Sequence, residues 1–241
     1  MSVGKQLLLN VRPRPDAQLA DFAGPVYAPV LAAVRSWLGL PGSLLYLYGE
    51  PGYGRSHLLA ALCAEAEQRG LSALVLSLPE VLEAGPELLV GLEQQAILAL
   101  DDVDAVAGRR DWEVGLFHLF NRAAAQGGSM IFSAAAPPGQ LGLVLPDLVS
   151  RLGQAAVWSM PRPDDASREA LVLAAAQRRG WVLDADVLRY LCQRLPREPG
   201  RLLGGLEALD QASLAAGRRL TVPFVRACLD GLGELGAKDS G

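Results

Sequence analysis

The chain has 241 residues, of which 51% are hydrophobic and 20% charged, and its formal net charge at pH 7 is −4. This hydrophobic fraction is sufficient for a sizeable core in one large domain or two smaller ones, without disulfide bonds to stabilise it. The negative net charge excludes a protein that binds nucleic acid through a globally basic surface.

Cysteine usage and the N-terminal residues indicate a cytoplasmic protein. Cys63, Cys192 and Cys228 lie far apart in helical patterns, so we expect buried thiols in a reducing compartment. Together with two histidines, His57 and His118, they have no spacing suited to zinc. The first residues lack the apolar core of a signal peptide, and glycine and proline pairs interrupt the longest uncharged stretch. We therefore expect neither export nor a membrane span.

Residues 1–21 contain Pro13 and Pro15 among charged residues and show no sustained periodicity, which predicts an extended N-terminal arm. Residues 22–163 then alternate between short apolar strands and helices. The pattern predicts strands at 44–48, 73–78, 96–100, 130–133 and 155–159, and helices at 56–69, 86–95, 111–126 and 146–152. This alternation is typical of an α/β fold, a parallel sheet with helices on both faces.

After Pro163 only helical patterns follow. They predict helices at 165–179, 184–195, 199–216 and 223–232, with Asp184 and Thr221 as N-caps. We therefore expect a small all-helical lid domain over residues 164–233, following the α/β domain, and a disordered tail over residues 234–241.

A glycine-rich segment joins the first predicted strand to the helix at 56–69. It reads Gly49-Glu50-Pro51-Gly52-Tyr53-Gly54-Arg55-Ser56 and is followed by His57. Glycines allow successive backbone N–H groups to point at a phosphate, and the helix adds its positive N-terminal end. The segment predicts a phosphate-binding loop in which Arg55 stands where lysine is usual. Because a guanidinium is bulkier than an ammonium, we expect tight nucleotide binding with slow turnover; an ordinary glycine-rich turn is the alternative.

A pair of carboxylates follows another predicted strand. Asp101 and Asp102 come directly after the apolar run at 96–100. Because parallel strands deliver their carboxyl ends to one edge of a sheet, both should lie beside the glycine-rich loop. We expect Asp101 and the hydroxyl of Ser56 to hold Mg²⁺, partly through water, and Asp102 to orient an attacking water.

Four further side chains are weaker candidates. Ser133 could help to position water near a γ-phosphate, although a serine at a strand end is more often a turn former. Asp104 is expected to cap or turn its loop. Arg151 follows a predicted short helix and Arg201 begins a lid helix. Taken alone, either arginine is most simply interpreted as a solvated surface charge.

Several segments together resemble the AAA+ module of the DnaA/Hda group of replication proteins. They are the glycine-rich loop, the Asp-Asp strand, Pro146-Asp147-Leu148-Val149-Ser150-Arg151-Leu152, Glu198-Pro199-Gly200-Arg201-Leu202-Leu203 and Leu220-Thr221-Val222-Pro223-Phe224-Val225. The match runs from about Phe22 to Leu232. The sequence stops before the helix-turn-helix domain of the larger initiators could begin, so we expect no direct sequence-specific DNA binding.

The resemblance implies a nucleotide site that would hold ADP or ATP with Mg²⁺. The residues that match its loop are Gly49, Gly52, Gly54, Arg55 and Ser56, together with their neighbours Pro51, Tyr53 and His57. Asp101 and Asp102 match the metal-and-water strand, and residues 22–27 match the segment near the adenine. Ala135 stands where the family often has aspartate, which weakens the case for hydrolysis in this site.

The resemblance also gives roles to three isolated residues. Ser133 matches the first sensor, and Arg201 matches the second sensor, a lid arginine that reports which nucleotide is bound. Arg151 matches the arginine finger, which completes the site of a neighbouring subunit and can accelerate hydrolysis by about 10³–10⁵-fold.

Within the arm, Gln6-Leu7-Leu8-Leu9 resembles the peptide by which such proteins dock on the sliding clamp of DNA polymerase III, its beta subunit. Gln6 would fix the register, and Leu7 and Leu9 would fill an apolar groove. A frayed terminus is the alternative. The resemblance thus implies two partners, the clamp and the initiator DnaA, and head-to-tail homo-oligomers are a third association to expect.

The expected function is that of a nucleotide-bound regulator of replication initiation. Docked on the clamp, it would present Arg151 to the ATP of DnaA, and hydrolysis would inactivate the initiator. Its own ATPase activity is expected to be weak or absent. The alternatives are a self-sufficient AAA+ ATPase such as a helicase loader, and a small-molecule P-loop kinase, against which the long helical lid argues.

Overall fold

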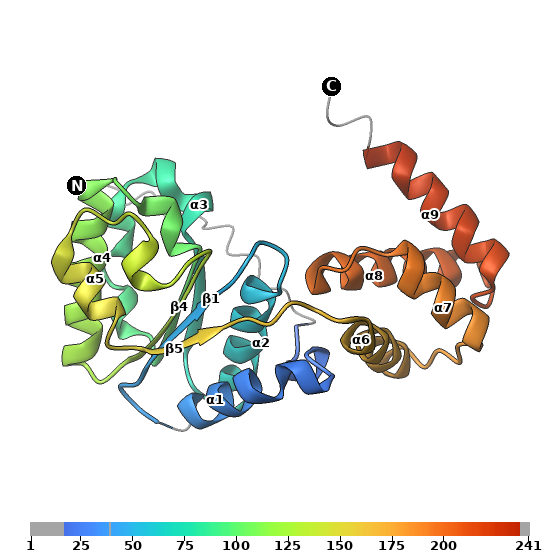
Figure 1. Cartoon of the computed structure of the whole chain (residues 1–241), viewed down its shortest axis with the longest axis horizontal. Coiled ribbons are helices and arrows are strands. Elements are labelled where there is room, and N and C mark those ends of the chain that lie inside the picture. The colour runs from blue at the N-terminus through green and yellow to red at the C-terminus, as the bar shows by residue number, and fades with distance from the viewer. Residues whose placement is uncertain (1–16, 39, 237–241) are drawn as a thin grey trace, which may run out of the picture.

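The computed structural model of the chain describes residues 17–38 and 40–236, the last five of these by their backbone alone. The described residues form a sheet with helices on both faces, followed by a group of four helices (Figure 1). The α/β class expected from the alternating pattern is confirmed.

The sheet has five parallel strands in the order β2-β3-β4-β1-β5. The strands are β1 (Leu44–Tyr48), β2 (Ala73–Ser77), β3 (Ile97–Asp101), β4 (Ser129–Ala134) and β5 (Ala156–Ser159). Because all five run in the same direction, the loop after β1 and the ends of β3 and β4 meet at one edge. Every residue of β3 and β4 is buried, whereas β5 is an exposed edge strand.

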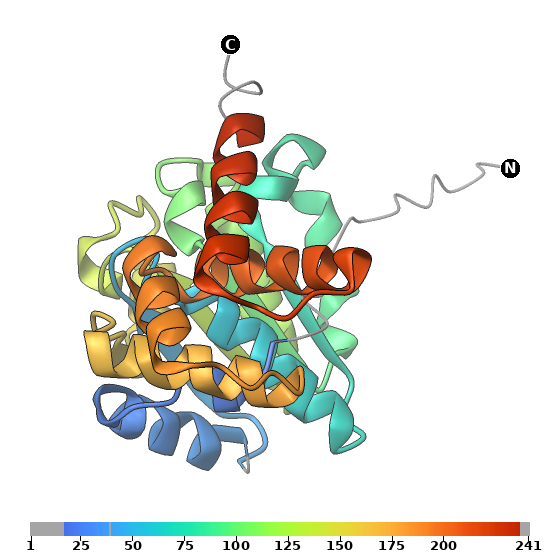
Figure 2. The ribbon, with the colours of Figure 1, turned by 90° about the vertical axis from the view of Figure 1, so that its right-hand side faces the viewer.

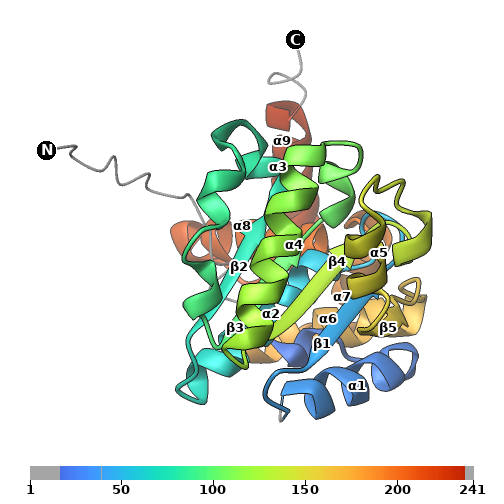
Figure 3. The same cartoon turned by 90° about the vertical axis from the view of Figure 1, so that its left-hand side faces the viewer.

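Two helices cover one face of the sheet and three cover the other (Figure 3). The first face carries α1 (Ala28–Leu38) and α2 (Arg55–Gln68); the second carries α3 (Leu78–Val81), α4 (Arg110–Ala125) and α5 (Pro146–Leu152). The strands alternate between the two cores, as a period of two requires. In β1, Leu45 and Leu47 pack against α1 and α2, while Tyr46 packs on the opposite side.

The lid consists of α6 (Asp165–Arg178), α7 (Ala185–Arg194), α8 (Pro199–Ala216) and α9 (Val222–Gly236), seen from its own side in Figure 2. It has a separate apolar core in which Leu191, Leu202 and Leu206 are fully buried. The side chain of Asp164 caps α6 by accepting a hydrogen bond from the Ser167 N–H at 2.7 Å. Asp184 precedes α7 as expected, but its side chain makes no capping bond.

Several short elements differ from the expectation. The expected helix at 86–95 is wrong: the segment forms two 3₁₀ turns, separated where Gly91 has a φ of 91°. The sequence patterns also did not indicate α1 or α3. The 3₁₀ turns are η1 (Leu19–Asp21), η2 (Pro25–Tyr27), η3 (Leu82–Ala84), η4 (Pro86–Leu89), η5 (Leu92–Gln94), η6 (Val103–Val106) and η7 (Pro138–Gln140).

Two further expectations need correction. Residues 17–21 were expected in an extended arm, but Ala17, Leu19 and Asp21 are buried against the core. The three cysteines were expected to be buried thiols; Cys63 is buried, whereas Cys192 and Cys228 are half-buried.

Asp21 joins η1 to α2 and to the lid. Its side chain is fully buried; Oδ2 lies 2.8 Å from Nε2 of His57 in α2, and Oδ1 is ion-paired with Arg178 of α6. Burial raises the pKa of Asp21, but the hydrogen bonds from His57 and the Gln18 N–H, with the charges of His57 and Arg178, lower it more. The net result is a pKa below the ordinary value, so the carboxylate stays ionised and links three segments.

Replacing Asp21 by asparagine should lower the free energy of unfolding by about 2 kcal/mol, because it removes the buried carboxylate that contacts His57 and pairs with Arg178. Since the folded-state pKa is depressed, the stabilisation should be present above the ordinary pKa of 3.8 and lost as the pH falls below it. Urea denaturation at several pH values measures both effects. The control is Asp186→Asn, which removes an exposed pair with Arg189. Equal midpoints for the two variants would contradict the prediction.

Candidate functional site

The glycine-rich loop connects β1 to α2 at the carboxyl edge of the sheet. Its glycines adopt conformations that other residues avoid: φ is 87° at Gly52 and 93° at Gly54. There is also no room for side chains. A Cβ atom at Gly52 would lie 2.4 Å from Cγ of Glu198, and one at Gly54 would lie 3.0 Å from the ring of Phe22. Positive φ values at alternate positions turn backbone N–H groups toward a common centre, which is a geometry that binds anions.

Arg55 is buried at the start of α2. Its Nη2 donates to Oδ1 of Asp102 at 2.8 Å, so the loop after β1 is ion-paired with the end of β3. Its Nη1 is also buried and has no hydrogen-bond partner among the described residues. Burying a guanidinium nitrogen without a hydrogen-bond acceptor costs folding free energy, unless a bound ligand supplies the acceptor. The residues present therefore fit an anionic group such as a phosphate.

Ser133 connects the two aspartates at the end of β3, Asp101 within the strand and Asp102 directly after it. Its hydroxyl donates to Oδ1 of Asp101 and accepts a hydrogen bond from the Asp102 N–H at 2.9 Å. Asp102 has a φ of 54°, a left-handed conformation that no other non-glycine residue adopts in the described part of the chain. Asp104 accepts a hydrogen bond from the Ala135 N–H at 3.0 Å and so ties the loop after β3 to the end of β4.

The carboxyl group of Asp102 has an unusual acidity. Burial raises its pKa, and the negative charges of Asp101 and Asp104 raise it further, against the opposing effect of Arg55; the resulting pKa is about 6. A carboxyl group with a pKa this close to neutral can accept or release a proton under physiological conditions. This property is compatible with the expected role in orienting or activating water.

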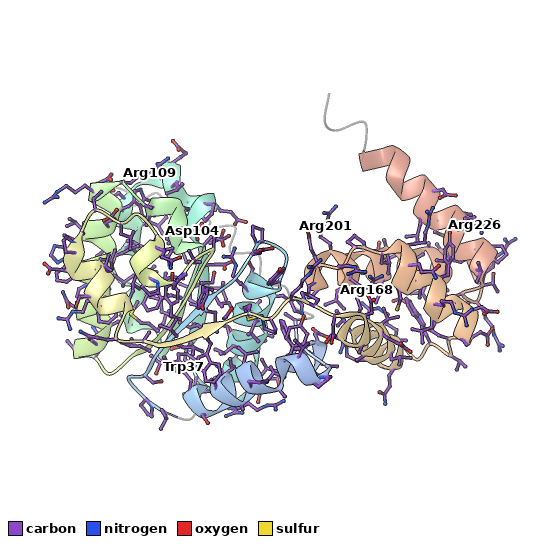
Figure 4. The ribbon with its side chains drawn as sticks, in the orientation of Figure 1. Trp37, Asp104, Arg109, Arg168, Arg201 and Arg226 are labelled. Carbon is purple, nitrogen blue, oxygen red and sulfur yellow. The ribbon has the colours of Figure 1, made fainter. Side chains whose placement is uncertain are left out.

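The lid contributes residues next to the loop. Glu198 and Pro199, at the start of α8, lie against Gly52 and Gly54. Arg201 follows in the first turn of α8, at the end of the lid nearest the sheet (Figure 4); its side chain is 71% exposed, with Nη1 3.7 Å from Oε2 of Glu198. The structure thus brings Arg201 to the edge of the site, with its guanidinium turned to solvent.

The first turn of α2 also carries Ser56 and His57. Ser56 is half-buried and follows Arg55 directly. A magnesium ion would take the Ser56 hydroxyl and, partly through water, the Asp101 carboxylate, which are the oxygen ligands that Mg²⁺ prefers. No group of three or more histidine, cysteine or acidic side chains suited to a metal occurs within residues 17–38 and 40–236.

The other loop residues, and Phe22 from the segment expected near the adenine, lie around the same loop. Tyr53 donates its hydroxyl to Glu50 at 3.0 Å, and Pro51 is exposed at the tip of the loop. Gly49 donates its N–H to the Ala134 carbonyl at 3.2 Å, which ties the loop to β4. Phe22, from the segment expected near the adenine, packs 5.6 Å from the ring of His57.

Arg151 does not belong to this cluster. It lies in the last turn of α5, which Figure 1 places on the far side of the sheet from α2. Its guanidinium carbon stands 5.6 Å from the centre of the Phe120 ring in α4. The described residues include no ion pair to Arg151.

Two contacts at the site had no sequence signal. Asp21 holds His57 behind the loop, and Glu198, which stands in a segment recognised from the sequence, packs on Gly52; neither contact could be foreseen, because the partners are distant in the chain. The expected clamp-binding residues Gln6, Leu7 and Leu9 lie outside the described residues. None of the helices in the described ranges is long and apolar enough to cross a bilayer.

Comparisons with known proteins agree with this geometry. Residues 45–153 match the family model of the ATPase family associated with various cellular activities (AAA), and residues 164–229 match the model of the Hda lid domain. Domain III of the replication initiation protein DnaA from Thermotoga maritima is similar in structure, with a TM-score of 0.74 and 21% identity over 90% of this chain and 97% of that one.

Two other solved structures share the fold at low identity. AMPPCP-bound DnaA from Aquifex aeolicus has a TM-score of 0.66 and 24% identity, over 83% of this chain and 66% of that one. The Thermotoga maritima RuvB Holliday junction branch migration motor has a TM-score of 0.64 and 16% identity, over 90% of this chain and 72% of that one.

The parallel sheet, the glycine-rich loop and the helical lid define an AAA+ protein. Its lid matches the model of the Hda lid domain, so the two family models together identify an Hda-like AAA+ protein. The AAA+ fold and the DnaA/Hda resemblance expected from the sequence are thereby confirmed.

Removing Arg55 should raise the pKa of Asp102 above about 6, because Arg55 is the one positive charge that opposes the shift. The pKa of Asp102 is measured in the wild type and in Arg55→Gln, both free of nucleotide. In each protein the ¹³C resonance of the Asp102 carboxyl group is followed by NMR during a pH titration. The ion pair requires ionised Asp102, so it stabilises the protein above this pKa and is lost as the pH falls through it. Arg55→Gln should therefore cost more stability at about pH 8 than at about pH 5.

The matched control is Arg69→Gln, which removes an exposed pair with Glu65 on the same helix. It should leave the titration of Asp102 unchanged. An Asp102 pKa that stays the same or falls in Arg55→Gln would show that the two side chains are not paired in solution.

Proposed function

We propose that the chain is a nucleotide-bound regulator of replication initiation that stimulates hydrolysis of the ATP held by DnaA. It would do so by presenting Arg151 to the initiator's site while docked on the sliding clamp. The observation that carries the proposal is the separation of two arginines: Arg55 lies in the chain's own loop, and Arg151 lies across the sheet with no ion pair among the described residues.

The chain's own site is suited to holding ADP or ATP with Mg²⁺. The amides between positions 49 and 56 and the buried guanidinium of Arg55 would bind phosphates, Ser56 and Asp101 would hold the metal, and the bound nucleotide would link the loop to the lid. Arg55 and Asp102 form a pair, so the carboxylate that would orient water is already engaged. This pairing supports slow turnover in the chain's own site and a structural role for its nucleotide.

Arg151 would act on a different molecule. Its helix lies away from the chain's own loop (Figure 1), and the residue is half-buried, so part of its surface is accessible from outside. A guanidinium placed beside a γ-phosphate neutralises the charge that develops on its oxygens as the bond to the leaving group breaks. The relationship to DnaA, together with the Hda lid, supports DnaA as the partner that holds this phosphate.

Arg151→Ala should reduce stimulated ATP hydrolysis by DnaA about 10³-fold, because the transition state loses its external cation. Nucleotide affinity of the variant should not change, since Arg151 lies outside that site. The measurement is ATP hydrolysis by ATP-loaded DnaA in the presence of clamp on DNA, with Arg189→Ala, which alters an exposed lid arginine, as the control. Full stimulation of DnaA by Arg151→Ala would contradict the proposed mechanism.

The alternative is a self-sufficient ATPase such as a helicase loader. ATP hydrolysis by the isolated protein at a rate comparable to that of stimulated DnaA, abolished in Asp102→Ala, would favour this alternative.

Clamp docking is proposed to depend on Gln6, Leu7 and Leu9. The double substitution Gln6→Ala with Leu9→Ala should abolish binding to immobilised clamp, because it removes both the amide that sets the register and an apolar anchor. Leu8→Ala, at the variable position of the motif, is the matched control. Binding that survives the double substitution would return this segment to a frayed terminus.

A further inference from the structure

We propose that Glu113 and Phe120, on one face of α4, are positioning residues that hold Arg151 in its active geometry. The inference rests on the proposed function of Arg151. Neither residue would touch the initiator's ATP; they would act by fixing the two ends of α5, the short helix that carries Arg151.

Glu113 fixes the beginning of α5. Its side chain is fully buried and accepts three backbone hydrogen bonds. Oε2 accepts from the N–H of Leu145 at 2.7 Å, and Oε1 accepts from the N–H groups of Val144 at 3.0 Å and Gly108 at 2.9 Å. Leu145 is the N-cap residue of α5. The carboxylate therefore binds the residue from which α5 starts.

The buried carboxylate of Glu113 is not paired with a positively charged side chain of the described residues. None of the ion pairs among the described residues includes Glu113, so the three N–H donors, which come from two separate loops, are what compensate it. Hydrogen bonds from backbone N–H groups to an ionised carboxylate are stronger and shorter than those between neutral groups. The arrangement fixes the loop before α5 more firmly than a neutral side chain would.

Phe120 fixes the other end of α5. It lies seven residues after Glu113, which is two helical turns and therefore the same face of α4. The guanidinium of Arg151 lies over its ring at 5.6 Å, and the ring is itself stacked on Phe132 of β4 at 6.2 Å. Since Phe132 lies in a fully buried strand, the aromatic pair gives the guanidinium a rigid base.

Packing fixes the rotation of α5 between these two contacts. Leu148 and Leu152 are buried against the α4 side of the sheet, and Arg151 is half-buried beside them. Held over the Phe120 ring, Arg151 would lose less side-chain entropy on entering a partner's site than an arginine without such a contact. A catalytic group misplaced by about 1 Å can lose about 10²-fold in rate, which is why such fixation matters.

The first experiment measures stimulation of ATP-loaded DnaA by Glu113→Gln over a range of regulator concentrations. An amide has a single acceptor oxygen and would place an NH₂ group against an N–H donor, so the start of α5 should shift. We expect the maximal stimulated rate to fall about 10-fold while the half-saturating concentration changes less than about twofold. Asp111→Asn, which removes the same charge from an exposed position of α4, should behave as wild type.

The second experiment needs no partner and observes Arg151 directly. In the wild type, the ring current of Phe120 should shift the Arg151 Nε–H resonance away from that of free arginine. Phe120→Leu should abolish this shift and lower the maximal rate, while Phe120→Tyr, which keeps the ring, should preserve both. In Glu113→Gln, hydrogen exchange at the Leu145 amide should accelerate about 10-fold or more.

The outcomes separate this inference from the proposed function. Full stimulation by Arg151→Ala would overturn the proposed function itself. If Arg151→Ala abolishes stimulation but Glu113→Gln and Phe120→Leu retain the full maximal rate, only the positioning inference is wrong. An unshifted Arg151 resonance in the wild type would also overturn it, as would normal exchange at Leu145 in a Glu113→Gln variant whose folding has been verified by circular dichroism.

Discussion

The ion pair between Arg55 and Asp102 joins the two segments on which the candidate site is built. One follows β1 and the other follows β3, and they meet because parallel pairing brings the carboxyl ends of the strands to one edge. Around this pair, Ser133 fixes both aspartates and Asp21 fixes the first turn of α2 through His57. The site is therefore held by polar contacts from four separate stretches of the chain.

The two faces of the sheet carry different candidate sites. The α2 face and the lid surround the loop that would hold a nucleotide, whereas the α4 face holds Arg151 for use elsewhere. The sheet connects the two, since Tyr46 in the strand that feeds the loop lies 6.5 Å from Phe132, the ring beneath Phe120. A rigid, densely packed core between the sites keeps each at a defined position relative to the other.

Much of the fold could be predicted from the sequence because apolar runs and glycine stops mark strands and long helices clearly. The strand at 44–48 and the helix at 146–152 were predicted to the residue. The segment 86–95 was not, since its apolar residues pack as 3₁₀ turns around Gly91. The loop and the Asp-Asp strand were recognisable by spacing, but Asp21 and Glu113 bind partners as far as 157 and 32 residues away, and Glu198 packs on Gly52.

The absence of side chains at Gly52 and Gly54 determines how closely the lid can approach the glycine-rich loop. Glu198 and Phe22 occupy the volume that a methyl group at these positions would need. On the lid side, the side chains of Glu198 and Pro199 therefore approach the backbone of the loop directly. Because Glu198 and Pro199 lie over Gly52 and Gly54, an outward movement of α8 would uncover both glycines at once, so the position of the lid would decide how much of the loop is open to solvent.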